Sequence, residues 1–149
     1  MKFPFFKKKT ETHSNEVSNE MYLNAIVESI EQIPFAIANE NVCYAGLNEL
    51  AGYLFFQTII VGKLKTKTFK GASLKIIGDD FELNLKSDMQ ELESNSSKIP
   101  NRYITPIDFI INESEAKKID KSKIKTVTLI VKNITIDFEC FEAINDEEE

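Results

Sequence analysis

Two stretches of the chain alternate between apolar and polar residues on both sides of a short turn, which is the pattern of an antiparallel β-hairpin. The first spans residues 72–86, and the tolerance of glycine for positive φ favours Gly78-Asp79 as its two-residue turn. One face of this hairpin is then apolar, and the other carries a cross-strand ion pair between Lys75 and Glu82. The expected opposite pairs are Ile76–Phe81, Lys75–Glu82, Leu74–Leu83 and Ala72–Leu85.

The second hairpin spans residues 126–141 and turns at Lys132-Asn133. A one-residue slip would move every apolar side chain to the opposite face, so the pattern specifies the register. The second face is mixed, because Ile124 and Ile130 lie on it beside polar residues, and we expect part of it to be covered. The expected pairs of the apolar face are Val131–Ile134, Leu129–Ile136 and Val127–Phe138.

The first predicted element of the domain is an amphipathic helix over residues 18–33, which Pro34 ends because proline cannot donate to the preceding turn. The residues of its apolar face recur at helical spacing: Leu23, Ile26, Val27, Ile30 and Ile33. We expect a short strand pair at 35–38 and 42–45 next, followed by a helical turn that starts near Leu47. This order resembles the opening of a PAS sensor domain, but the chain lacks the long helical middle of that family, so we assign no family.

The remainder of the chain predicts β structure. Residues 53–66 read as a long bent strand with Gly62 at a bulge, and 103–111 as a strand in which Pro106 indicates an edge or a bulge. The polar segment 87–100 between them predicts a mobile loop. Asn112 and Glu115 have the spacing of a capping box for a short helix through Ile119.

These elements predict an α+β domain: an N-terminal amphipathic helix followed by a mostly antiparallel β-sandwich or partly open barrel of about six to eight strands. We place a flexible basic leader at 1–15, a single domain at 16–143 and an acidic tail at 144–149. The short apolar start is followed at once by lysines, which leaves no room for a secretory signal, so we expect a cytoplasmic protein. The same Phe/Lys start also suits contact with an anionic membrane surface.

Composition argues against most familiar chemistry. His13 is the only histidine of the 149 residues and lies in the leader, which disfavours histidine metal centres and Ser-His or Cys-His catalysis. None of the five glycines forms a phosphate-binding loop, and Cys43 and Cys140 are expected to be free, buried thiols. We therefore expect no cofactor, no metal and no catalytic residue. The formal net charge of −6 also disfavours a nucleic-acid partner.

A group of lysines is the one candidate binding surface: Lys63, Lys65 and Lys67 at alternate positions, followed by Lys70. They could protect an exposed strand edge or meet an acidic partner, and they would form a larger patch if the lysines of 117–125 were neighbours. No aromatic residues for base stacking alternate with them in the sequence. Our interpretation is a non-enzymatic module for macromolecular interaction or assembly, with another protein as the expected partner.

Two alternatives remain open. The first is a binder of an apolar small molecule in the sheet interior, which requires a cavity lined by Phe55, Phe56, Phe81 and Phe109. The second is a carboxylate-dependent hydrolase, which requires at least two acids that converge in one cleft. The acids considered for it are Asp88, Glu91, Glu93, Asp108, Asp137 and Glu139.

Overall fold

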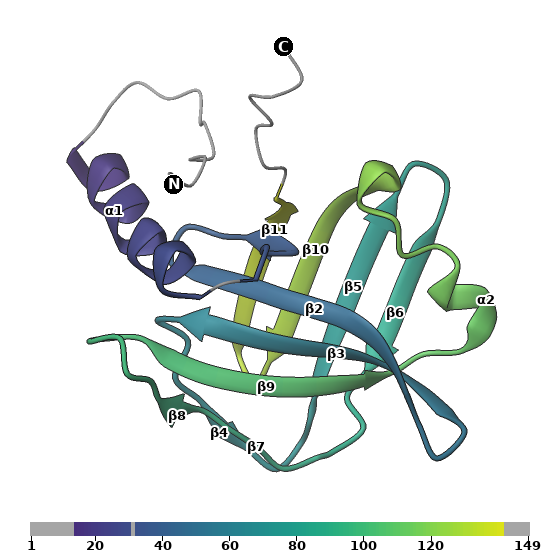
Figure 1. Ribbon diagram of the computed structural model, residues 1–149. Coiled ribbons are helices and arrows are strands. Elements are labelled where there is room, and N and C mark those ends of the chain that lie inside the picture. Colours follow the sequence, from purple (N-terminus) through teal and green to yellow (C-terminus); the bar gives the residue numbers. More distant parts are fainter. Residues whose placement is uncertain (1–13, 31, 142–149) are drawn as a thin grey trace.

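The computed structural model describes residues 14–30 and 32–141, and Figure 1 shows how its elements are arranged. The predicted leader and acidic tail lie almost entirely outside the described residues. The helices are α1 (Ser14–Ser29), α2 (Glu113–Ala116) and the 3-10 turn η1 (Lys121–Lys123). The strands are β1 (Ala36–Ile37), β2 (Asn41–Leu50), β3 (Tyr53–Gly62), β4 (Lys67–Thr68), β5 (Ala72–Gly78), β6 (Glu82–Lys86), β7 (Leu92–Glu93), β8 (Asn95–Ser96), β9 (Tyr103–Ile110), β10 (Ile124–Val131) and β11 (Ile134–Cys140).

Nine of these strands form one curled antiparallel sheet in the order β6-β5-β10-β11-β1-β2-β3-β9-β8, while β4 and β7 pair separately. Figure 1 shows that β5, β6, β10 and β11 run across β2, β3 and β9, so the sheet folds back on itself as a half-barrel of two layers. The two-residue strand β1 joins the layers at one corner. At the opposite margin Ser87 bridges to Phe109, and the amide of Asp88 donates to the carbonyl of Asp108 at 2.8 Å. The predicted antiparallel β fold is confirmed.

The core lies between the two layers. Strand β5 alternates buried and half-buried side chains along its whole length, and Phe56, Phe109 and Leu129 are almost completely buried. Phe56 also packs edge-on against Phe35, with 5.4 Å between the ring centroids. Burial of such side chains stabilises the fold by about 25 cal/mol per Å² of apolar surface removed from water.

A second apolar cluster lies on the outer face of the sheet, where α1 packs against β1, β2 and β3. Leu23, Ile26 and Val27 are buried there against Val42 and Val61. The helix ends at Ser29, before the predicted end at residue 33. Ile33 is 71% exposed, so its expected place on the buried face is wrong.

The register of the second hairpin is confirmed, because Val131 pairs with Ile134, Leu129 with Ile136 and Val127 with Phe138. Its outer face is only partly covered, since Ile124 is buried whereas Ile130 is 41% exposed.

The register of the first hairpin differs from the prediction by two residues, because Leu74 pairs with Leu85 and Ile76 with Leu83. The turn residues are Asp79-Asp80, since the amide of Gly78 donates to the carbonyl of Phe81. A shift of two residues leaves each side chain on the same face of the hairpin. Lys75 Nζ therefore still lies 3.7 Å from Glu82 Oε2, now as a diagonal ion pair. The ring of Phe81 occupies the space next to Gly78 that a Cβ atom would fill, so this glycine provides room rather than a positive φ.

Two further expectations need correction. The strand pair at 35–45 is present, with Ala36 opposite Cys43, but the chain does not form a helical turn after it. Strand β2 continues to Leu50, because Ala51 (φ 53°) and Gly52 (φ 83°) turn the chain directly into β3. The segment 87–100 contains β7 and β8, and Leu92 is buried in the core, so it is not one long loop.

Two local elements are shorter than predicted, because β3 ends at Gly62 and not at residue 66, and α2 ends at Ala116 and not at Ile119. Two further local expectations are confirmed. Pro106 lies on β9 opposite Ile59. On the other side of β9, no described strand pairs with the residues between Ile104, which faces β8, and Phe109, which bridges to Ser87, so Pro106 lies at an edge as expected. Asn112 and Glu115 form the expected capping box at the start of α2.

Cys43 is buried as expected, whereas Cys140 is half-buried, so the prediction of two buried thiols holds for Cys43 alone. Ala36 pairs with Cys43 on one side and with Cys140 on the other, so two strand spacings, about 10 Å, separate the cysteines, too far for a disulfide. Burial raises the pKa of Cys43 to about 12, and the nearby Cys140 adds to the shift. No helix among the described residues is long and apolar enough to cross a membrane.

Candidate functional site

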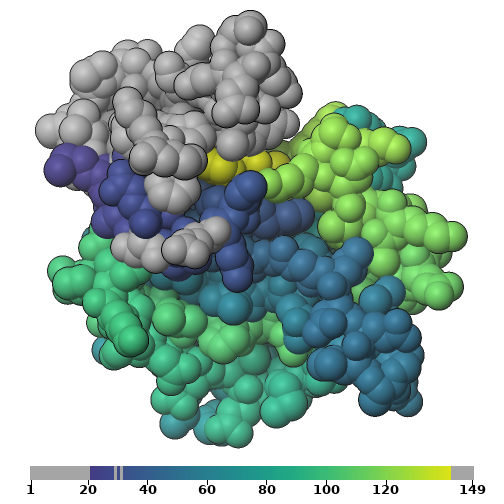
Figure 2. All heavy atoms as spheres, in the orientation of Figure 1, coloured from purple at the N-terminus to yellow at the C-terminus, as the bar shows by residue number. Residues whose placement is uncertain are grey.

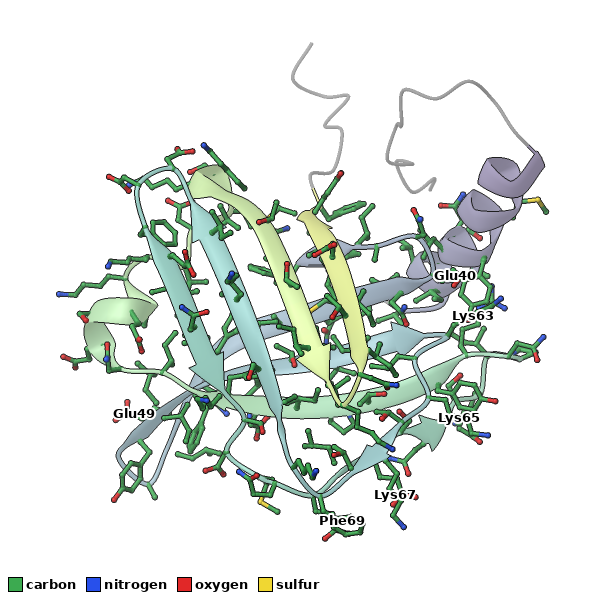
Figure 3. All side chains as sticks on the ribbon, turned by 180° about the vertical axis from the view of Figure 1, so that it is seen from behind. Glu40, Glu49, Lys63, Lys65, Lys67 and Phe69 are labelled. Atoms are coloured by element: carbon green, nitrogen blue, oxygen red, sulfur yellow. The ribbon has the colours of Figure 1, made fainter. Side chains whose placement is uncertain are left out.

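The predicted lysines follow one another along the segment that leaves β3. At Gly62 the carbonyl of Glu40 occupies the place where a Cβ atom would lie, so a residue without a side chain lets the chain turn out of the sheet. The next residues alternate strictly: Leu64, Thr66 and Thr68 are buried, and the lysines between them are exposed. Figure 3 shows Lys63, Lys65 and Lys67 in a line down one side of the molecule, with Phe69 at its lower end.

The backbone of this segment is tied to the barrel from both sides. The amide of Leu64 donates to the side chain of Asn41 at 2.9 Å. The amide of Thr66 donates to Ser94 Oγ, and the amide of Ser94 donates to the carbonyl of Thr66, both at 2.9 Å. Ser94 Oγ also lies 2.6 Å from the hydroxyl of Thr105 in β9. The lysines therefore project from a fixed backbone.

Each of the first three lysines lies over an aromatic ring. Lys63 Nζ is 5.6 Å from the ring centroid of Tyr22, Lys65 Nζ is 5.2 Å from that of Tyr103, and Lys67 Nζ is 5.8 Å from that of Phe69. Such contacts are worth about 0.5–1 kcal/mol at exposed sites. The rings come from α1, β9 and the lysine segment itself, so the sequence, in which Tyr22 and Tyr103 are distant, does not show this pairing.

Arg102 adds a further cation beside Tyr22. Its guanidinium lies 3.7 Å from the ring centroid, and its Nη2 donates to the carbonyl of Tyr22 at 2.6 Å. The phenol of Tyr22 in turn donates to the carbonyl of Asn101 at 2.8 Å. Burial raises the pKa of Tyr22, while the charge of Arg102 acts in the opposite direction.

The charges along the segment are mostly uncompensated. Lys63 forms an ion pair with Glu40 at 3.4 Å. Within the part of the chain that the structure describes, Lys65, Lys67 and Lys70 form none. Glu93 lies opposite Lys67 in the β4–β7 pair without forming an ion pair with it.

The line of lysines ends in an open concavity of about 740 Å³, lined by Lys67, Thr68, Phe69, Lys70, Lys132 and Asn133. Lys132 and Asn133 belong to the β10–β11 turn, where Lys132 has φ 55°. The ring of Phe69 is 65% exposed at the edge of this concavity. Sequence reasoning missed Lys132, because its proximity to the others depends on how the layers fold together. We call Lys63, Lys65, Lys67, Lys70 and Lys132 the lysine strip.

The other group of lysines does not extend this strip. Residues 117–125 follow α2 and include η1 and the start of β10, and Figure 1 shows α2 at the right of the molecule and β4 at its lower margin. Lys121 lies against another part of the chain, where its Nζ donates to the carbonyl of Pro34 at 2.9 Å.

Most residues of the two alternative functions are dispersed, although Asp88 and Asp108 are neighbours, since the amide of Asp88 donates to the carbonyl of Asp108. Phe56 and Phe109 lie in the core, whereas Phe55 pairs with Ile110 on the outer face, so the phenylalanines do not line one space. Asp108 on β9 accepts from Gln57 at 3.4 Å, while Asp137 on β11 in the other layer accepts from Thr128 at 2.8 Å.

Among the described residues, no three His, Cys, Asp or Glu side chains gather as metal ligands would. No protein-family model, curated protein or solved structure matches this chain at a significant level.

Proposed function

We propose that this protein is a non-enzymatic interaction or assembly module of the cytoplasm, and that its lysine strip binds an acidic segment of a partner protein. One observation carries the proposal: Lys65, Lys67 and Lys70 project from a fixed backbone on one side of the barrel and form no ion pair with the described residues. Positive charges arranged in this way attract a complementary surface and select partners by charge.

The aromatic rings support a protein partner over a nucleic acid. Binding of single strands requires exposed ring faces on which bases can stack. Tyr22 and Tyr103 are half-buried beside cations of the chain itself, so of the three rings along the strip only Phe69, next to Lys67, is largely exposed. The rings of the strip thus hold cations in place, and the ammonium groups remain free to donate to carboxylates.

The proposal includes the α+β organisation of the domain. Helix α1 is expected to act as an amphipathic cover for the outer face of β1, β2 and β3, and burial of Leu23, Ile26 and Val27 supports this role. The apolar and basic leader before it is proposed to be available for contact with a membrane surface.

A nuclear magnetic resonance titration tests the proposal directly. The isotopically labelled full chain is titrated with an oligoglutamate peptide, and in parallel with a single-stranded oligodeoxynucleotide of similar charge. We expect the peptide to shift the amide signals of residues 63–70 and 132–133 at low salt and much less at physiological salt, because exposed charges are screened.

Two results would count against this function. Shifts that gather at 117–125 would place the acidic site on the other group of lysines. Stronger binding of the oligonucleotide, with the largest shifts at the signals of Phe69 and Tyr103, would indicate a nucleic-acid partner instead.

A further inference from the structure

A different margin of the sheet has an open edge. Strand β2 pairs with β3 along all ten of its residues, but β1 covers its other side only at Val42 and Cys43. The carbonyls of Asn41 and Cys43 point to that side, because they accept from the amides of Ala38 and Phe35. Backbone groups alternate in direction along a strand, so those of Ala45 and Leu47 point to the same side. Within the described residues these backbone groups have no hydrogen-bond partner.

This edge lacks the features that keep the other margins from pairing with another chain. Strand β9 carries Pro106, the β4 margin carries the lysine strip, and β11 carries Asp137 and Glu139. Exposed strand edges are commonly blocked by proline, by charges or by short length. From residue 45 to 48 the β2 edge reads Ala-Gly-Leu-Asn, and its first charge is Glu49.

Exposed apolar side chains accompany the open edge. Leu47 is 45% exposed, Leu50 48% and Tyr53 71%, and all three belong to the β2–β3 hairpin. Figure 2 shows the atoms of this hairpin, in blue, as a protruding lobe at the lower right of the molecule. Nothing lies within 4 Å of the place that a Cβ atom would take at Gly46, so the face of the hairpin is also open at that position.

We propose that the free edge of β2 pairs with the same edge of a second copy, antiparallel and with Leu47 on the two-fold axis. This register places Leu47 opposite Leu47 of the second copy and Glu49 opposite Ala45, so no like charges face each other. The three side chains offer on the order of 300 Å² of apolar surface per copy, less than the roughly 800 Å² of a standard-size interface. The dimer is therefore weak, and the fraction of the chain that is dimeric rises with protein concentration. It lies away from the lysine strip, since Figure 3 shows Glu49 and Lys65 on opposite sides.

Cysteine trapping tests this geometry. In the Leu47→Cys variant of the full chain, mild oxidation is expected to give a covalent dimer, because the two thiols face each other across the axis. The Leu50→Cys variant is the matched control, because Leu50 is equally exposed but lies opposite Tyr44 of the second copy in this register. The wild-type chain controls for Cys43 and Cys140.

Equal cross-linking of both variants would indicate random collision and would overturn the proposal, as would no cross-linking of Leu47→Cys. Sedimentation equilibrium gives an independent measure: the wild-type chain is expected to show a dimer fraction that rises with concentration. Leu47→Lys, which places two positive charges on the axis, is expected to remain monomeric with an unchanged circular dichroism spectrum. If the wild-type chain were monomeric at every concentration, pairing with a second copy would be excluded, and a strand of another protein would be the remaining partner for this edge.

Discussion

The lysine strip and the β2–β3 hairpin are two margins of the same barrel with opposite chemistry. The strip follows Gly62 on one side and carries a lysine at every second position from 63 to 67. It is tied to β7 by strand pairing and to Thr105 of β9 through Ser94. The hairpin extends on the other side, with only Glu49 charged between residues 41 and 62, and one side of its first strand is open. Figure 3 shows the two margins apart, with Lys65 and Glu49 on opposite sides of the molecule.

This difference shows how one sheet can present two kinds of surface. A charged margin resists pairing with other strands, because desolvation of a lysine beside another chain is costly, and it attracts acidic groups instead. An uncharged margin with free backbone groups offers the hydrogen bonds of one more strand. The strip is suited to an acidic partner of a different kind, and the hairpin is suited to a second copy.

The largest expected effect concerns the core on which both margins depend. Leu129→Asp places a charge at a fully buried position, and we expect it to destabilise the domain by several kcal/mol, enough to unfold it. Ile130→Asp changes the neighbouring residue, which is 41% exposed on the other face, and we expect the fold to persist. Thermal unfolding followed by circular dichroism measures the stability of both variants. An equal loss of stability in the two variants would contradict the register of β10.

A smaller effect should separate the two margins themselves. Gly62→Ala brings a Cβ atom against the carbonyl of Glu40 where the strip leaves β3, and we expect a loss of about 2–3 kcal/mol. Gly46→Ala adds the same methyl group to the open hairpin strand, and we expect a change of less than about 1 kcal/mol. Urea denaturation measures the difference. Similar losses of unfolding free energy in both variants would contradict the difference between the hydrogen-bonded lysine strip and the open β2–β3 hairpin.

The smallest effect concerns Tyr44, where β2 passes from beneath α1 towards the open hairpin. Its hydroxyl is buried without a hydrogen-bond partner among the described residues, and burial raises its pKa to about 12. Tyr44→Phe removes this desolvated group, so we expect a gain of about 1 kcal/mol at pH 7.

The pH dependence of that variant gives a second measure. Between pH 10 and 12 the unfolded tyrosine ionises while the folded one stays protonated, so the wild-type protein loses stability as the pH rises through this window. The phenylalanine variant lacks this loss, and its advantage in urea denaturation should therefore widen above pH 10. A variant less stable than wild type at both pH values would show that the hydroxyl has a partner.

The sequence predicted those parts of the fold that depend on local pattern. Alternation determined the register of the 126–141 hairpin, and the capping box at Asn112 was found from its spacing alone. The register of 72–86 was wrong because two turns one residue apart preserve the same faces, and the choice depends on the ring of Phe81 packing over Gly78. The extent of β2 was missed because alanine, leucine and asparagine in 45–50 fit a helical turn equally well, and pairing with β3 decides between them.

Only part of the candidate site could be predicted from the sequence. Alternate lysines indicated an exposed segment, and the structure places Lys63, Lys65 and Lys67 on one side. The rings of Tyr22 and Tyr103 and the contribution of Lys132 depend on contacts between segments far apart in the chain, for which a single sequence gives no signal.

The most direct test of the central claim compares two charge-reversal variants in binding to a labelled oligoglutamate peptide. Lys65, Lys67 and Lys70 are changed to Glu in one variant, and Lys117, Lys123 and Lys125, exposed on another side, in the other, so both have the same net charge. Fluorescence anisotropy at low salt is expected to show binding at least about tenfold weaker for the first variant, and a small change for the second. Equal weakening of both would mean that overall charge, and not the lysine strip, controls binding, and would contradict the account.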